Sequence, residues 1–416
     1  MSRVGGNPPD ILAMATFHRA SRISAVLTGR SGALMTLCTA VPKGSLNRMQ
    51  VPLSRPSITQ ADIAAVLEVL NSPSLSLGPK LAAFERAMAD YSGTAEAVAV
   101  NSGTSGLHLC LAAAGIKPGD EVITTPFSFV ASANCALYQG ATPVFADIDP
   151  LTLNIDPNQV EARLTARTRA LVPVDVFGQP APIEDLMVIA ENHGLRLIRD
   201  ACEAIGAERN GRRIGSQGQA TVFAFYPNKQ MTTGEGGVIV TNDVAYSRVV
   251  RSMSNQGRDD DGTWMNHVRL GYNYRLDEMS AALGLSQLRR LDAIIARRAR
   301  VASWYNERLR DVKGVQIPYV APETTRMSWF VYVVRVDERV ERDRLMAELQ
   351  EEGIPSRPYF VPIHLQPLYR QRFGFRPGDF PVTERIARTT LALPFFTEMT
   401  EEQVNYVCER LAARLE

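Results

Sequence analysis

Three segments of this chain combine residue types that could do chemistry together, and each follows an apolar run that predicts a β-strand. Asn-Ser-Gly-Thr-Ser-Gly at 101–106 is a turn of small residues that opens a predicted helix, whose N-terminus could bind a phosphate. Asp200 follows the apolar run 195–198 and could pair with a protonated ring nitrogen. Lys229 follows the apolar run 221–225, and its amine could form a Schiff base with an aldehyde. In this order the segments predict a pyridoxal phosphate enzyme.

Each of these residues also has a simpler explanation. A lone lysine is most often a solvated surface residue, and a glycine-rich turn is often an ordinary strand–helix connection. An aspartate at a strand end commonly caps the next helix, so the two roles of Asp200 are separated by whether its side chain faces the pocket. The Thr-Thr-Gly-Glu-Gly-Gly segment at 232–237, together with Asp200 upstream, favours the catalytic interpretation of Lys229.

These segments resemble the DegT–DnrJ–StrS family of sugar aminotransferases, pyridoxal phosphate enzymes of the aspartate aminotransferase fold (fold type I). The resemblance covers about residues 50–416 and rests on separated segments in a fixed order, namely 101–108, 126–134, 200–207, 225–237, 271–287 and 362–367. It implies that the chain moves an amino group from glutamate to a keto group of a nucleotide-linked sugar.

The resemblance and the residue types together predict the cofactor contacts. Lys229 would hold the cofactor and, once released, would act as the base that moves a proton. Asp200 would keep the ring nitrogen protonated, and Phe129 would stack on the ring, although a core position is the alternative for this phenylalanine. The phosphate would be bound at the helix N-terminus by Gly103, Thr104 and Ser105.

The chain departs from the family pattern at three positions. Arg199 stands where the family often has an acid, and we expect it to point away from the site. Glu203 replaces the polar group, usually Gln or His, that lies near the ring hydroxyl, so its role is open. Ala224 lacks the phosphate-binding hydroxyl that the family places five residues before the lysine, and Tyr226 or Asn228 could substitute for it.

The resemblance also implies a site shared between two subunits. In the family, the segment matching 271–275 reaches the phosphate of the neighbouring subunit's cofactor, and Asn273 is the matching residue. A surface turn before a helix is the alternative. If the shared site holds, the chain is a homodimer and a monomer is inactive.

Substrate contacts are expected from several other side chains. Arg258 could meet a carboxylate or a phosphate of the substrate by bidentate hydrogen bonds, and a solvated loop charge is the alternative. A lone histidine is more often structural, so His364 has both a substrate-facing and a structural interpretation. The expected substrate-facing residues are Tyr226, Arg258, Arg357, Tyr359 and His364.

The composition limits the other classes. The 416 residues carry a net charge of +1, which gives no basic field for nucleic acid. Five scattered cysteines show neither metal-ligand spacing nor a disulfide framework, which fits a reducing, cytoplasmic setting. Five histidines form no paired ligand motif, so we expect no metal. No run approaches the roughly 18 apolar residues of a membrane helix.

Residues 1–48 differ from the rest because they hold six basic residues against one acid, Asp10. This composition is typical of a transit peptide. The alternative is a poorly structured extension translated from an upstream start codon, since the segment from Met49 looks like a natural beginning.

The alternation of short apolar runs with helical patterns between 97 and 241 predicts an α/β domain with a mostly parallel sheet flanked by helices. We expect this large cofactor-binding domain over 49–295 and a smaller α+β domain over 296–416. A long, bent helical region at 276–310 would join them.

Other functions remain open at this point. A cyclitol ketone could replace the nucleotide sugar as acceptor. A sugar dehydrase of the same fold would carry histidine in place of Lys229, and a non-catalytic regulator would have lost the lysine or Asp200.

Overall fold

The computed structural model describes residues 48–259 and 265–415. They belong to one compact unit, 47–416. The predicted N-terminal extension therefore lies, apart from Arg48, outside the described residues. The predicted division near residue 295 stays a prediction.

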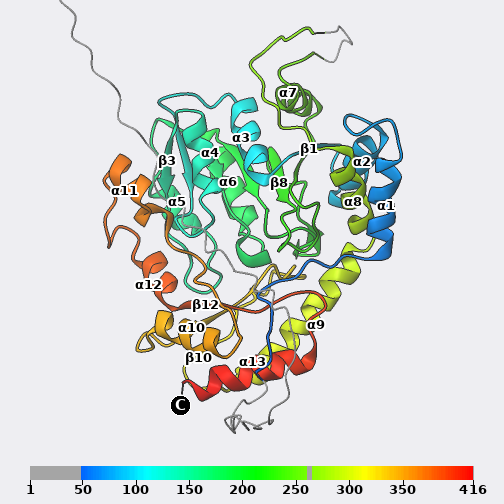
Figure 1. Ribbon diagram of the computed structural model, residues 1–416. Helices are drawn as coiled ribbons and strands as arrows, with labels where there is room; N and C mark the ends of the chain where they lie inside the picture. The colour runs from blue at the N-terminus through cyan, green and yellow to red at the C-terminus, as the bar shows by residue number, and fades with distance from the viewer. Residues whose placement is uncertain (1–47, 260–264, 416) are drawn as a thin grey trace, which may run out of the picture. The chain divides into compact units, whose positions relative to one another are not determined.

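A seven-stranded sheet forms the centre of the N-terminal part of this unit (Figure 1). Its strands are β1 (Glu96–Val100), β2 (Glu121–Thr124), β3 (Thr142–Phe145), β4 (Thr168–Val172), β5 (Arg196–Asp200), β8 (Ala220–Ala224) and β9 (Gly237–Thr241). Their order is β1-β9-β8-β5-β4-β2-β3. Within this sheet β9 pairs antiparallel with both neighbours, and the other pairs are parallel. This confirms the predicted mostly parallel sheet.

Helices cover both faces of the sheet because successive strand residues point to opposite sides. The helices of this part are α1 (Gln60–Leu70), α2 (Pro79–Ser92), α3 (Gly103–Ala113), α4 (Ala131–Tyr138), α5 (Pro157–Glu161), α6 (Ile183–His193), α7 (Val244–Ser254) and α8 (Glu278–Leu288). On β1, Val98 and Val100 join the core built with α3, α4 and α7. Ala97 and Ala99 of the same strand join the core built with α2 and α8. Burial on both faces explains the continuous apolar character of the strands.

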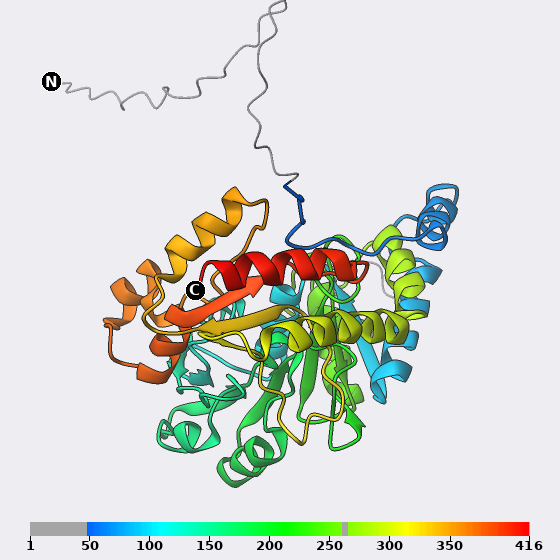
Figure 2. The ribbon, with the colours of Figure 1, turned by 90° about the horizontal axis from the view of Figure 1, so that it is seen from below.

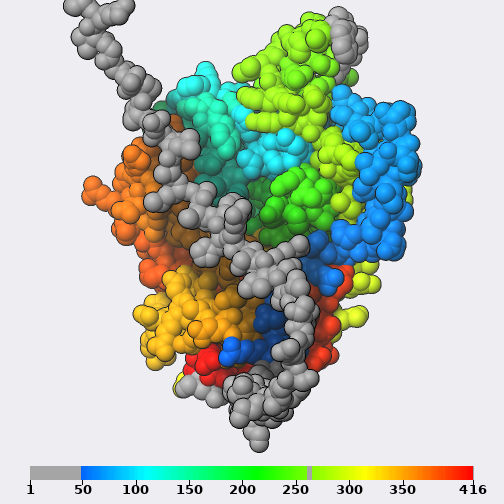
Figure 3. All heavy atoms as spheres, in the orientation of Figure 1, coloured from blue at the N-terminus to red at the C-terminus, as the bar shows by residue number. Residues whose placement is uncertain are grey.

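The predicted helical region at 276–310 is two helices, α8 and α9 (Leu291–Leu309). Asp62 of α1 is buried and accepts hydrogen bonds from Ser286 (2.7 Å) and Gln287 (3.0 Å) of α8. Figure 3 shows α1 and α2, in blue, beside the yellow-green surface of α8.

The C-terminal part is built on a three-stranded antiparallel sheet of β10 (Val315–Gln316), β11 (Tyr332–Val336) and β12 (Thr390–Leu393). Helices α9 and α13 (Glu401–Ala413) lie side by side (Figure 2). Tyr305 of α9, Tyr332 of β11 and Val407 of α13 belong to one buried core. The remaining elements are β6 (Glu208–Arg209), β7 (Arg212–Arg213), the 3-10 turns η1 (Val176–Gly178) and η2 (Ile363–Leu365), and the helices α10 (Arg342–Glu351), α11 (Pro367–Phe373) and α12 (Pro381–Thr389).

The structure differs from the sequence prediction mainly at element ends. Helix α3 begins at Gly103, two residues before the start at Ser105 that the sequence predicts, because the Ser102 hydroxyl accepts the Ser105 N–H and so acts as the N-cap. Helices α7, α11 and α12 were not predicted. None of the helices in the described ranges is both long and apolar enough to cross a membrane.

Candidate active site

A cavity of about 470 Å³ opens where the carboxyl ends of β1, β5 and β8 meet. Parallel sheets collect ligands at this edge. The residues that line it are Ser102, Gly103, Thr104, Leu107, Ser128, Phe129, Ala131, Val174, Asp200, Cys202, Glu203, Ala224, Tyr226, Asn228, Lys229, Glu235, Gly236, Phe330, Tyr359 and Phe360.

Lys229 lies in this cavity with its side chain 13% exposed. Its Nζ lies 3.7 Å from the ring centroid of Phe330 and 3.7 Å from Oε1 of Glu203. The backbone N–H of Lys229 donates to the Tyr226 carbonyl over 2.9 Å, which fixes the turn after β8. The amine is therefore held inside a pocket, and the solvated-surface explanation does not apply.

Asp200 also faces the cavity from the end of β5. Its Oδ2 accepts the Ser132 hydroxyl at 2.7 Å, and its Oδ1 accepts the Cys202 N–H at 3.2 Å. The next element along the chain is β6, so no helix of the described chain begins where Asp200 could cap it. This geometry separates the two interpretations in favour of a pocket residue.

The N-terminus of α3 forms the third part of the site. The backbone N–H groups of Gly103 and Thr104 have no partner among the described residues, and both residues line the cavity. A Cβ added at Gly103 would lie 2.7 Å from Sγ of Cys202 and 2.8 Å from Cβ of Ala224, so only glycine fits there. Unpartnered N–H groups at a helix start suit an anion.

Ser105, expected among the phosphate contacts, lies outside the cavity lining. Its hydroxyl donates to Oδ1 of Asn101 at 2.7 Å, and its N–H is taken by the cap. Ser102 lines the cavity instead. The Ser-x-x-Ser spacing could have suggested this cap, since both serines are possible N-cap residues.

Three aromatic residues predicted for the site are present in the cavity wall. Phe129 is 62% exposed and Tyr226 is 52% exposed, so their rings are open to a ligand. Tyr359 is half-buried, and burial together with the Glu203 carboxylate raises its pKa to about 12. It therefore stays a neutral hydroxyl near pH 7.

Asn273 and Arg258 do not line this cavity. Asn273 is exposed and pairs through its backbone with Asn255. Arg258, in the loop after α7, is half-buried, with Nη2 3.4 Å from Oε1 of Gln256. Within one chain the structure does not bring these two residues to the lysine.

His364 and Arg357 also lie away from the cavity lining. The His364 ring is fully buried against Phe380, and its Nε2 lies 3.1 Å from Oε1 of Glu384. Burial lowers its pKa, with Glu384 opposing the shift. His364 is thus buried outside the cavity lining of one chain, and its expected substrate contact stays a prediction. Arg357 is exposed, and its Nη1 donates to the Ser356 carbonyl.

A family model of the DegT/DnrJ/EryC1/StrS aminotransferase family matches residues 56–412 of this chain. The chain belongs to this aminotransferase family. The match confirms the resemblance that the motifs indicated, and it identifies the protein as a transaminase.

Individual relatives agree with the family assignment. The aminotransferase is 38% identical over 366 residues to GDP-perosamine synthase from Caulobacter vibrioides, covering 87% of this chain and 97% of that protein. Among solved structures, DesV from S. venezuelae has a TM-score of 0.83 and 36% identity, covering 88% of this chain and 99% of DesV. Spr1654 from Streptococcus pneumoniae, solved in a PLP form, has a TM-score of 0.83 and 27% identity, covering 88% and 100%.

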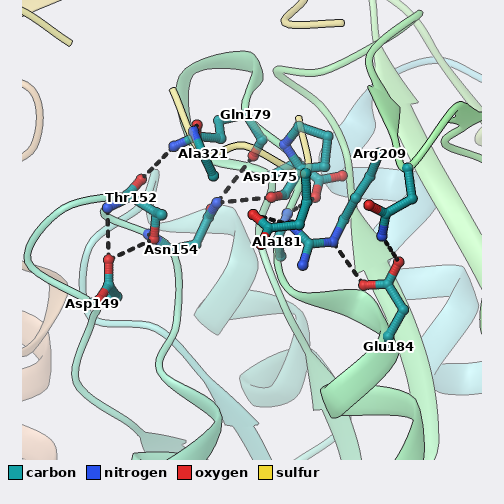
Figure 4. A network of polar contacts seen from close by, with 12 residues as sticks. Asp149, Thr152, Asn154, Asp175, Gln179, Ala181, Glu184, Arg209 and Ala321 are labelled. Carbon is teal, nitrogen blue, oxygen red and sulfur yellow. Dashed lines mark hydrogen bonds and ion pairs between the residues drawn. The ribbon is translucent and has the colours of Figure 1, made fainter. Parts of the chain in front are cut away.

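The aminotransferase contains a network of polar contacts around Asp175 that the motifs did not indicate (Figure 4). Arg199 and Asp175 are fully buried and form two hydrogen bonds, Nε to Oδ2 (2.7 Å) and Nη2 to Oδ1 (2.8 Å). Burial raises the pKa of Asp175, and Arg199 opposes this shift. The Asp175 carboxylate also accepts the Ala181 N–H at 2.7 Å. Arg199 does not line the cavity, in agreement with the expectation that it points away from the site. Through Asp175 it anchors the segment leading into η1.

The described part of the aminotransferase holds no group of three or more His, Cys, Asp or Glu residues arranged to bind a metal ion. Its cavity contains three carboxylates, Asp200, Glu203 and Glu235. Among the lining residues within 48–259 and 265–415, Lys229 is the only lysine or arginine. Phe330 was missed by the motif reasoning because it comes from the C-terminal part, about a hundred residues after the lysine.

Proposed function

We propose that this aminotransferase uses pyridoxal 5′-phosphate to move an amino group from glutamate to a keto group of a nucleotide-linked sugar. The observation that carries the proposal is the meeting of Lys229, Asp200 and the N-terminus of α3 in one cavity. The name of the Caulobacter relative, GDP-perosamine synthase, supports a nucleotide-linked substrate.

The residues present fit this cofactor. The free N–H groups of Gly103 and Thr104 suit its phosphate, and Asp200 offers a carboxylate to a ring nitrogen. The Asn228 Oδ1 is buried without a hydrogen-bond partner among the described residues, which marks a polar atom awaiting a ligand. Asn228 is therefore better placed than the exposed Tyr226 to compensate for the hydroxyl missing at Ala224.

Bound pyridoxal phosphate would supply an electron sink for the bond broken at the donor carbon. Lys229 would hold the cofactor and then move a proton through its Nζ. Phe129, open to the cavity, would cover the ring and exclude water. Asp200, fixed by its two donors, would keep the positive charge of the ring nitrogen in place.

We further propose a homodimer with shared sites. Among the described residues that line the cavity of one chain, Lys229 is the only lysine or arginine, so the cavity offers little positive charge to the carboxylates and phosphates of the proposed substrates. Asn273 is exposed and free to enter a neighbouring chain's cavity. A second subunit would add its segment 271–275 to the site.

The test loads the protein with pyridoxamine phosphate and offers a panel of acceptors, with the visible pyridoxal absorbance as the readout. We expect the band to recover with a nucleotide-linked keto-sugar and glutamate to bleach it again. If the visible band recovers only with a keto-cyclitol, the acceptor is a cyclitol ketone and not a nucleotide-linked sugar. If no acceptor restores the band and glutamate does not remove it, the proposed reaction is wrong.

A further inference from the structure

Glu203 is a buried carboxylate beside Lys229, and the expected chemistry assigns it no role. Its side chain is 7% exposed, and its Oε1 lies 3.7 Å from Nζ of Lys229. This distance is longer than a hydrogen bond of roughly 2.7–3.2 Å, and it lies within the range of an ion pair. Direct proton exchange between the carboxylate and the amine requires that the two groups approach to hydrogen-bond distance.

Glu203 is held in place by one backbone group. Its Oε2 accepts the Phe177 N–H at 2.9 Å, and no donor within 3.5 Å is found for Oε1 in the described chain. The carbonyl of the same Phe177 accepts the Phe330 N–H at 3.2 Å. Phe177 thus anchors both residues that flank the Lys229 amine.

Phe177 performs this task in an unusual conformation. Its φ is 58°, in the left-handed region that bulky residues rarely adopt. Neighbouring contacts hold it there, because the Val176 N–H donates to Oδ1 of Asn154 and the Ser328 N–H donates to the Gly178 carbonyl. A strained backbone conformation that neighbouring contacts maintain often has a functional role. Here the strained residue supplies the N–H that binds Glu203.

The other carboxylates are less suited to exchange a proton with the lysine. Asp200 already accepts the Ser132 hydroxyl and the Cys202 N–H, and it forms no ion pair with Lys229 within 4.0 Å. Glu235 is exposed. The charged or titratable groups that interact with Glu203 are Lys229, Asp200, Cys202 and Tyr359.

We propose that Glu203 is the proton partner of Lys229. One N–H bond of the lysine ammonium breaks and one O–H bond forms on the carboxylate, which leaves a neutral amine able to act as a base and a neutral carboxyl group. The net charge of the cavity is unchanged, and the proton returns in the reverse step. Burial raises the pKa of Glu203, which makes its carboxylate a better proton acceptor. This role acts through Lys229 and rests on the proposed function.

The test compares Glu203→Gln with Glu235→Gln in the cofactor-loaded protein. Each variant removes one negative charge from the same cavity, and the amide introduced by Glu203→Gln keeps an oxygen for the Phe177 N–H. We expect Glu203→Gln to move the pH midpoint of the visible band down by at least about one unit, because a carboxylate favours the charged form of a neighbouring nitrogen. Glu235→Gln should titrate as the wild type does.

The second readout is the pH profile of the half-reaction with glutamate in a single turnover. In the wild type the rate should fall at low pH as Glu203 becomes protonated and can no longer accept a proton. Glu203→Gln should lose this acid limb and slow the step by about thirtyfold or more, with the KM for glutamate changed less than about threefold. Glu203→Asp, which keeps the carboxylate, should retain the limb at a lower rate.

A merely structural role predicts a different result. If Glu203→Gln keeps both the spectral midpoint and the acid limb of the wild type, the inference is wrong even when the rate falls. If Glu203→Gln does not fold, Glu203→Asp replaces it in the test. Loss of the acid limb of the pH–rate profile in Glu203→Asp would then refute the inference. A wild-type protein with no visible band would overturn the proposed function and this inference together, whereas a normal wild-type band leaves only Glu203 in question.

Discussion

At the scale of single residues, the Asp200 carboxylate is oriented by two donors, and this fixed geometry allows a sharp test. Asp200→Asn keeps one acceptor oxygen, for either the Ser132 hydroxyl or the Cys202 N–H, and loses the negative charge. We expect the fold to persist and turnover to fall by several orders of magnitude. Ser132→Ala is the control, since it removes one hydrogen bond and keeps the charge. A loss below about tenfold for Asp200→Asn, or about 1.4 kcal/mol of barrier, would exclude a ring partner.

Glu203 gives a residue-scale prediction for stability against pH. Burial raises the pKa of Glu203 above its ordinary value of 4.5, with Lys229 opposing the shift. The folded protein therefore holds this proton more tightly than the unfolded chain does. Stability from the protonated form is present below pH 4.5 and is lost as pH rises through the raised pKa.

Glu203→Gln cannot lose that proton, so the cofactor-free variant should gain thermal stability relative to the wild type as pH increases from about 4.5 towards neutrality. Melting temperatures measured by circular dichroism at several pH values provide the check. A difference that is constant over this range, or that shrinks with rising pH, would contradict the sign.

At the scale of elements, the buried Arg199–Asp175 pair ties β5 to the segment that enters η1. Removing one partner leaves an uncompensated buried charge, which typically costs about 3–5 kcal/mol. We expect Arg199→Met to destabilise the protein by about this amount in chemical denaturation. The double variant Arg199→Met with Asp175→Asn should recover part of the loss, because no lone charge remains.

The matched control for this pair is Arg344→Met, which breaks the exposed Arg344–Glu348 pair of α10. Exposed pairs contribute little, so this change should leave the unfolding free energy nearly unaltered. If Arg199→Met lowers the unfolding free energy by no more than Arg344→Met does, the buried pair does not hold β5 and η1 together.

At the scale of the whole molecule, the proposed shared site predicts complementation between two inactive variants. Lys229→Ala and Asn273→Ala should each lose most of their activity. In a co-expressed heterodimer, one site carries both lesions and the other carries neither, so part of the activity should return. The proposed dimer should bury more than about 2,000 Å² in total.

The measurement needs differently tagged subunits and purified heterodimers. Confirmed heterodimers without activity, while each single change is severe, would place the role of Asn273 within its own subunit. A purified monomer that turns over at the wild-type rate would refute the shared site itself.

Across these scales, the sequence by itself determined the features that depend on short-range chemistry. Apolar strand runs followed by small or charged residues predicted that Gly103, Asp200 and Lys229 belong to one site. The carboxyl ends of parallel strands meet at one edge of a sheet, which brings these residues together. The alternation of strands and helices determined the mostly parallel sheet. These signals are local, so one segment at a time was enough to find them.

The tertiary structure alone decided which side chains meet across segments far apart in the chain. It enclosed His364 against Glu384, paired Arg199 with Asp175 and placed Phe330 and Glu203 around the Lys229 amine. Such contacts depend on sheet twist, helix packing and the backbone of a few strained residues. No periodicity in a single segment records these quantities, because a side chain's partner is set by the packing of elements that are distant in sequence.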